Sequence, residues 1–159
     1  MRLLGAGLIL AASVLLAAAL SRSETVRVRQ YEGMLRLLRA IREEIACFRT
    51  PTAAIYARFE NDALAAAGFL PVLRERGFSA ALTAAGERLL FDAEDARTLS
   101  AFAAGLGQHY PAEEVALCDR TIAELSASYD RKRREAPGRV RAARSLVLCG
   151  GAMLVLLFL

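Results

Sequence analysis

The two ends of the chain are its most apolar parts. Residues 3–20 are 18 consecutive uncharged residues, and residues 145–159 are 15 more. At 1.5 Å per residue the first run forms a helix of roughly 27 Å, about the thickness of the hydrocarbon layer of a bilayer. The second run reaches roughly 22 Å and is lengthened by the residues before it if their arginines extend to the interface. The pattern predicts transmembrane helices at 1–21 and 139–159.

The first apolar run has an alternative interpretation as a cleaved signal peptide. Arg2 would be its charged start, and the small residues at 17–21 would supply the cleavage site. The run is longer than the apolar region of most signal peptides, however, and several arginines follow it at once, which hinders translocation. We therefore favour an uncleaved membrane anchor.

Between the apolar ends, residues 22–138 show hydrophobic positions at helical spacing. The segment has no alternating β-branched run and no Asn-Gly or Asp-Gly hairpin turn, so the sequence predicts an all-α fold. The expected helices are a long first one continuing from the membrane, a second at about 51–66, a third at 79–90, a fourth capped by Asp92 and ended by Gly105 and Gly107, and a last long one from Pro111.

Two segments are expected to interrupt this series of helices. Residues 68–78 predict a turn-rich joint with a short helix at most, and Pro137-Gly138 predicts a joint before the second membrane segment.

The first and last of these helices each have a long apolar stripe. The stripe of the first consists of Tyr31, Met34, Leu35, Leu38, Ile41, Ile45 and Phe48, and that of the last of Val115, Cys118, Ile122, Leu125 and Tyr129. The second stripe has the 3, 4, 3, 4 spacing of a heptad seam. We expect the two stripes to pack antiparallel. The prediction is a small bundle of about five to six helices, flanked by N- and C-terminal transmembrane helices.

Charge is unevenly distributed along the chain. Residues 22–42 contain six Arg and two Glu, residues 131–144 contain seven Lys or Arg and one Glu, and residues 43–130 contain seven Arg and fourteen Asp or Glu. Basic residues therefore flank both apolar ends, which places the acidic middle in the cytoplasm and suits anionic lipid headgroups. The expected membrane-surface residues are Arg22, Arg27, Arg29, Arg131, Lys132, Arg133 and Arg134. Nucleic acid is a poorer partner, because no face combines aromatic and basic residues.

The stretch EEIACFRTP (43–51) is the densest group of reactive residue types. Glu43 and Glu44 are neighbours, so on a helix they point about 100° apart and do not form an acid/base pair in one pocket. Cys47 would need a base, and the chain has a single histidine, His109, in a glycine-rich turn. The three cysteines have no metal or CxxC spacing, which fits a reducing compartment, and no phosphate-binding motif is present. The sequence predicts no enzyme, no cofactor and no metal.

Several short motifs recur here in the order and spacing of a known family. These are the EI of IREEIACFRTP and the Thr-Pro after it, the LG of GLGQHYPAEE, and a basic flank leading into a final apolar tail with Gly-Gly. With the overall length and both apolar ends, the chain resembles the stage III sporulation protein AB family of endospore-forming bacteria. It departs from the family pattern after the LG turn, where Tyr110 stands at the expected Asp and no Gln follows, and in having no Trp, with Phe78 in that region.

The resemblance implies a specific role. The family looks like half of the inner-membrane platform protein of type II secretion and type IV pilus machines, and it is required for the channel between mother cell and forespore. It implies work beside the secretion-type ATPase of the channel and its ring-forming partners. It also implies that Glu44, Thr50, Pro51, Leu106 and Gly107 occupy the family's pattern.

The expected function is therefore a non-enzymatic membrane scaffold of this channel, two-pass, with a cytoplasmic loop, on the mother-cell side of the engulfing membrane. Its expected partners are membrane lipid, the ATPase, other stage III channel proteins and a second copy of the chain. The expected docking residues are Glu43, Glu44, Thr50, Pro51, Leu106, Gly107, Glu113 and Glu114. The alternative is an exported, tail-anchored helical binding module with a cleaved signal peptide.

Overall fold

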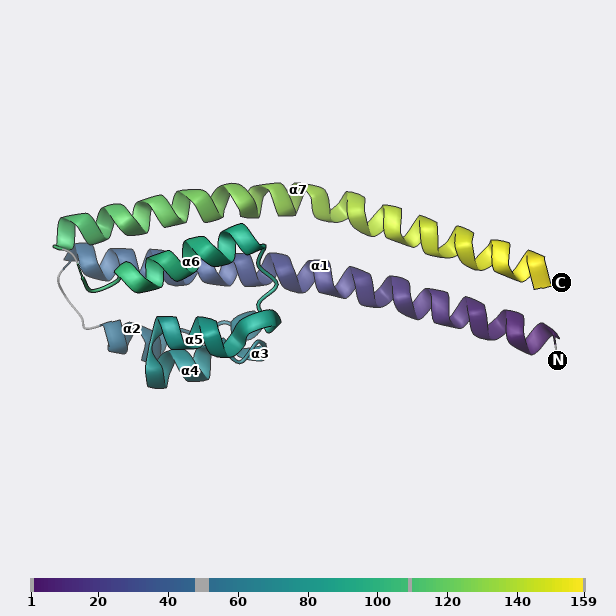
Figure 1. Ribbon diagram of the computed structural model, residues 1–159, viewed down its shortest axis with the longest axis horizontal. Coiled ribbons are helices and arrows are strands. Elements are labelled where there is room, and N and C mark those ends of the chain that lie inside the picture. Colours follow the sequence, from purple (N-terminus) through teal and green to yellow (C-terminus); the bar gives the residue numbers. More distant parts are fainter. Residues whose placement is uncertain (1, 48–51, 109, 159) are drawn as a thin grey trace. The chain divides into compact units, whose positions relative to one another are not determined.

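The computed structural model describes the backbone of residues 2–47, 52–108 and 110–158, and within them the side chains of 15, 18, 19, 21–47, 53–108, 110–138, 141, 142, 145 and 149. That part of the chain forms seven α-helices, one 3₁₀ helix and no strand, which confirms the all-α prediction (Figure 1). The elements are α1 (Arg2–Cys47), α2 (Thr52–Arg58), α3 (Asp62–Ala66), α4 (Phe69–Arg76), α5 (Phe78–Ala85), η1 (Gly86–Arg88), α6 (Ala93–Gly105) and α7 (Pro111–Phe158).

The chain forms two compact units. The terminal unit combines Met1–Val26 with Arg131–Leu159, and the central unit is Arg27–Asp130. Within the terminal unit, the beginning of α1 and the end of α7 are helical. No helix among the described residues is long and apolar enough to cross a membrane. Most side chains of the two predicted membrane segments lie outside the described residues, so both segments stay predictions.

The core of the central unit is built on the predicted stripe of α1. Tyr31, Met34, Leu38 and Ile41 are fully buried, and Ile45 packs against the core from its edge. Phe48 lies outside the described residues. The α1 stripe therefore forms as the 3.6-residue period predicts.

Helix α7 supplies the second predicted stripe. Cys118 and Leu125 are fully buried, and Ile122 and Tyr129 pack against the same core. Arg42 of α1 binds Asp119 of α7, whereas Tyr31, earlier in α1, binds the same carboxylate as Ser128, later in α7. Because contacts that advance along α1 move backwards along α7, the two helices are antiparallel, as the stripes predicted.

Helices α2 to α5 close the remaining side of the core. Helix α4 contributes Phe69, Leu70 and Leu73. The ring of Phe69 meets that of Phe78 edge-on at 5.6 Å, and the Phe78 ring in turn meets Phe102 of α6 at 5.4 Å. Edge-to-face pairs of this kind add about 0.5–1.5 kcal/mol beyond the buried area. The three rings thus join α4 and α5 to α6.

The predicted second helix at 51–66 is wrong, because two helices occupy it. α2 ends at Arg58, and Asn61 begins α3 with an extended backbone and a side chain that accepts the N–H of Leu64 at 3.0 Å. Asparagine is among the most favoured helix N-cap residues. Asn61 therefore starts a new helix here, so that α2 and α3 are separate. Ile55 is buried and Phe59 partly buried, so both predicted anchors of this region are confirmed.

Residues 68–78 were predicted as a turn-rich joint with a short helix at most, and the structure places the eight-residue helix α4 there. α4 is bounded by Gly68 and Gly77, whose φ angles of 76° and 84° suit glycine, and it supplies core residues. Pro71 lies in its first turn, where no helical N–H is lost. The third predicted helix is also shorter than expected, because α5 ends at Ala85 and η1 follows.

The joint predicted at Pro137-Gly138 is wrong as well. α7 continues through Pro137 as one helix from Pro111 to Phe158. A proline inside a helix removes the donor to the carbonyl four residues earlier and costs about 3 kcal/mol. That carbonyl belongs to Arg133, an exposed residue, so water can replace the missing donor. The starts of α6 after Asp92 and of α7 at Pro111 are as predicted.

Candidate functional site

The two predicted acidic pairs lie at the same end of the central unit. Glu43 and Glu44 are in the last turns of α1, and Glu113 and Glu114 are in the first turn of α7. Because α1 and α7 are antiparallel, these two helix ends meet, and Figure 1 shows them together at the left. We call Glu43, Glu44, Glu113 and Glu114 the acidic end. The predicted docking residues Thr50 and Pro51 lie outside the described residues.

An ion pair fastens the two helices just behind the acidic end. Arg42 Nε donates to Asp119 Oδ1 at 2.8 Å, and Arg42 Nη2 donates to Oδ2 at 3.3 Å. This two-point contact with Asp119 raises the pKa of Arg42 above its ordinary value. A bidentate contact holds both partners in a defined orientation. The pair therefore fixes the register that brings the two acidic helix ends together.

Three of the predicted docking residues have a structural role in the turn from α6 into α7. Gly107, with a φ of 82°, donates its N–H to the carboxylate of Glu114. Leu106 packs against the core from the edge. Leu106, Gly107 and Glu114 therefore close the turn, whereas Glu113 is exposed beside Tyr110, whose side chain is 80 % exposed.

The candidate catalytic residues do not form a site. Cys47 is exposed at the end of α1, and His109 lies outside the described residues. Cys118 is buried in the core, where burial and the nearby Glu114 carboxylate raise the pKa of its thiol to about 11. No group of three or more metal-binding side chains occurs in the part of the chain that the structure describes.

The two environments predict different thiol reactivity. A rise in pKa from 9.0 to about 11 lowers the reactive thiolate of Cys118 about a hundredfold at neutral pH, because only the ionised form attacks. In the full chain at pH 7.5 we expect a disulfide reagent to modify Cys47 quickly and Cys118 only on unfolding. Mass spectrometry measures the extent of modification at each cysteine. The double variant Cys47→Ser, Cys149→Ser leaves Cys118 as the single cysteine. Rapid labelling of this variant would contradict the buried position of Cys118.

A buried polar cluster, which the sequence did not predict, joins three helices of the central unit. Asp95 of α6 is 6 % exposed, and its carboxylate accepts hydrogen bonds from Tyr31 Oη at 2.5 Å and Ser128 Oγ at 2.8 Å. Burial and the bond to Asp95 raise the pKa of Tyr31 well above its ordinary value. Asp95 lies in the first turn of α6, and nothing in its spacing indicates burial.

Gln30 extends this cluster into the loop before α6. Its amide donates to the carbonyl of Arg88 at 3.0 Å and accepts the N–H of Leu90 at 2.7 Å, while the N–H of Asp92 donates to Tyr31 Oη at 3.2 Å. These bonds satisfy backbone groups that no helix pairs. The cluster is therefore structural, since every one of its bonds lies inside the protein.

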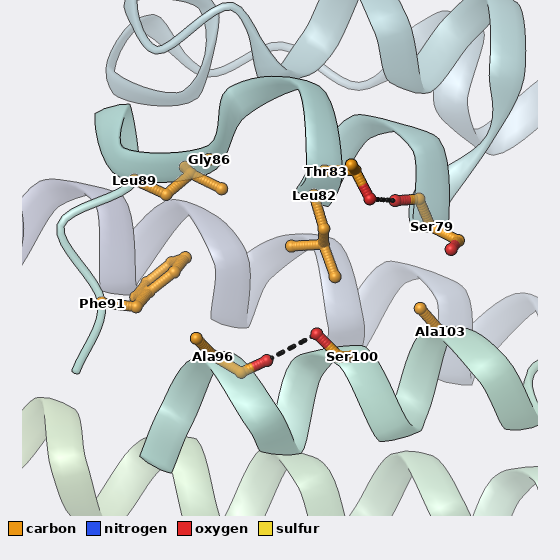
Figure 2. Close-up of a pocket in the computed structure, with 9 residues that line it drawn as sticks. All are labelled: Ser79, Leu82, Thr83, Gly86, Leu89, Phe91, Ala96, Ser100 and Ala103. Atoms are coloured by element: carbon orange, nitrogen blue, oxygen red, sulfur yellow. Dashed lines mark hydrogen bonds between the residues drawn. The ribbon is translucent and has the colours of Figure 1, made fainter. Parts of the chain in front are cut away.

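A groove of about 370 Å³ lies between α5 and α6 (Figure 2). Its wall includes Leu82, Phe91 and Ala103. Two of the hydroxyls that border it donate within their own helices, Thr83 to the carbonyl of Ser79 at 3.1 Å and Ser100 to that of Ala96 at 2.8 Å. No charged side chain lines the groove, so it offers no group for acid, base or metal chemistry.

The predicted membrane-surface residues differ in exposure. Five of them are exposed, namely Arg22, Arg29, Arg131, Arg133 and Arg134, whereas Arg27 is half-buried and Lys132 is buried. Their contact with lipid stays a prediction.

Comparison with known families settles the family. The model of stage III sporulation protein AB matches residues 2–159. The chain belongs to the stage III sporulation protein AB family. This confirms the resemblance, and membership implies a role in sporulation, in a family that is not known as enzymatic. No curated protein and no solved structure matches the chain.

Proposed function

We propose that this stage III sporulation protein AB family member is a non-enzymatic, two-pass membrane scaffold of the channel between mother cell and forespore. In this proposal its acidic end docks the secretion-type ATPase of the channel, together with other stage III channel proteins. The observation that supports it most is the position of Glu43, Glu44 and Glu113 at the same end of the central unit.

The position of the acidic end within the central unit supports docking. The chain enters this unit at Arg27 and leaves it at Asp130. Both residues are at the opposite ends of their helix segments from the acidic end, and α1 advances about 25 Å from Arg27 to Glu44 at 1.5 Å per residue. The acidic end therefore lies away from the two points at which the chain enters and leaves the central unit.

The remaining chemistry of the central unit also favours a scaffold. Its buried polar cluster is satisfied internally, and the groove between α5 and α6 has no charged lining. We further propose that the central unit resembles half of a secretion platform domain, that the apolar ends span the mother-cell side of the engulfing membrane, and that copies of the chain associate to rebuild the full platform.

Docking is tested by measuring the affinity of the purified ATPase for the full chain in lipid nanodiscs. Reversing Glu43, Glu44 and Glu113 to lysine is expected to weaken binding about a thousandfold, since charge pairs at an interface are worth about 1.5–7 kcal/mol each in favourable cases. Glu114 is left intact because it closes the turn at Gly107.

A matched control reverses Glu75, Glu87 and Glu94, which are exposed on α4, η1 and α6. These three reversals change the net charge by the same amount. This control is expected to bind like the wild-type chain. Equal weakening in both variants would show a general charge effect and would remove the acidic end as the docking surface.

A further inference from the structure

The end of α1 and helix α2 border a second groove, of about 280 Å³, beside the acidic end. We call it the α1–α2 groove. Its apolar lining is Ala40, Ile55 and Phe59, and its charged rim is Glu43, Glu44 and Arg58. Apolar lining inside a charged rim is the usual composition of a site for one protein side chain and its neighbour.

The α2 wall of this groove is held in place by the core and by Arg74. Ile55 and Tyr56 are buried in the core. The guanidinium of Arg74 donates to the carbonyl of Tyr56 at 3.4 Å and to that of Phe59 at 3.0 Å, and so satisfies carbonyls at the end of α2. Burial, with the nearby Cys118, raises the pKa of Tyr56 to about 12, so this residue adds no charge. The groove is therefore formed without a partner.

The rim has more negative than positive charge. Arg58 Nη2 lies 3.9 Å from Glu44 Oε1, too far for a hydrogen bond, and the Arg58 side chain is 69 % exposed. The Glu44 side chain is 30 % exposed. Glu43 is exposed and forms no ion pair with any residue that the structure describes. The rim thus has two carboxylates, of which only Glu44 lies near a guanidinium, and Arg58 Nε also donates to the carbonyl of Ala54 at 3.3 Å.

We propose that the α1–α2 groove binds a segment of the protein partner in which an arginine lies next to an apolar side chain. The apolar side chain contacts Ala40, Ile55 and Phe59, and the arginine pairs with Glu44. Arginine fits better than lysine because its planar guanidinium binds a carboxylate at two points. Anionic headgroups and acidic segments are repelled by the same two carboxylates. The proposal rests on the docking function above and specifies the chemistry of the docked segment.

The test uses the full chain in nanodiscs and the purified channel ATPase, with affinity measured by biolayer interferometry. Glu44→Gln removes the carboxylate, and Ala40→Leu fills the groove. Each is expected to weaken binding about tenfold, which corresponds to about 1.4 kcal/mol. The matched controls Glu87→Gln and Ala84→Leu change exposed residues of η1 and α5 and are expected to bind within about twofold of wild type.

A charge exchange identifies the partner's residue. Glu44→Arg is tested against ATPase variants in which each exposed arginine or lysine is changed in turn to glutamate. One arginine-to-glutamate variant is expected to restore affinity to Glu44→Arg and not to Glu87→Arg.

If the wild-type chain binds but Glu44→Gln and Ala40→Leu bind equally well, or if no exchange restores affinity, this proposal is overturned and the docking function stands. If the wild-type chain does not bind the ATPase, both are overturned. Loss of self-association or of lipid-vesicle binding in Glu44→Gln, with ATPase binding unchanged, would assign the groove to a second copy or to lipid instead and would also overturn it.

Discussion

Asp95→Ala is expected to lower the free energy of unfolding of the central unit by about 3 kcal/mol. The Asp95 carboxylate accepts hydrogen bonds from Tyr31 and Ser128, which belong to different helices. Alanine removes the acceptor of both buried hydroxyls, and a hydrogen bond to a charged group is worth about 1.5–3 kcal/mol. The expected loss is large because one side chain serves two donors.

Urea unfolding of the full chain in mild detergent, followed by circular dichroism at 222 nm, measures this loss. Asp95→Asn keeps one acceptor oxygen and the shape of the side chain, so it is expected to cost about 1–2 kcal/mol. Glu94→Ala alters the exposed neighbour in the same helical turn and is expected to cost about 0.5 kcal/mol. An Asp95→Ala chain as stable as Glu94→Ala would show that the cluster does not hold the three helices together.

Reversing the acidic end is expected to reduce heat-resistant spores to the level of a strain that lacks the gene. In the variant strain, Glu43, Glu44 and Glu113 are replaced by lysine. Like charges at an interface cost several kcal/mol, so three reversals are expected to prevent assembly at cellular concentrations. The measurement is the count of colonies after heating a sporulating culture.

Two controls accompany the spore count. The strain with Glu75, Glu87 and Glu94 reversed has the same net charge and is expected to sporulate normally. Immunoblots of membrane fractions verify that both variants accumulate equally. Normal sporulation of the acidic-end variant at normal abundance would contradict a docking role for these residues.

The helices that sequence periodicity predicted best are the longest ones. The stripes from Tyr31 to Ile45 and from Cys118 to Tyr129 are buried and antiparallel, because each depends on a repeated spacing over several turns. Short helices were predicted less well. The Asn61 cap that separates α2 from α3, and the core role of α4, depend on single residues whose local preferences are weak compared with packing.

The candidate site was predictable only in part. The two acidic pairs follow from charge at helix ends, and their meeting follows from the antiparallel stripes. The bond from Gly107 to Glu114 and the burial of Asp95 depend on side-chain positions in three dimensions, and a carboxylate in the first turn of a helix has the same sequence pattern whether it is exposed or buried. The α1–α2 groove likewise requires the placement of Arg74 behind α2, which no spacing predicts.

In the proposed function the acidic end contacts the channel ATPase in the cell. Site-specific photo-crosslinking tests it most directly, with p-benzoyl-L-phenylalanine placed at position 113 in sporulating cells and, as the control, at position 87. We expect a crosslinked species containing this chain and the ATPase from position 113 and none from position 87. Crosslinking to the ATPase from position 87 alone, or from neither position while the channel assembles, would contradict it.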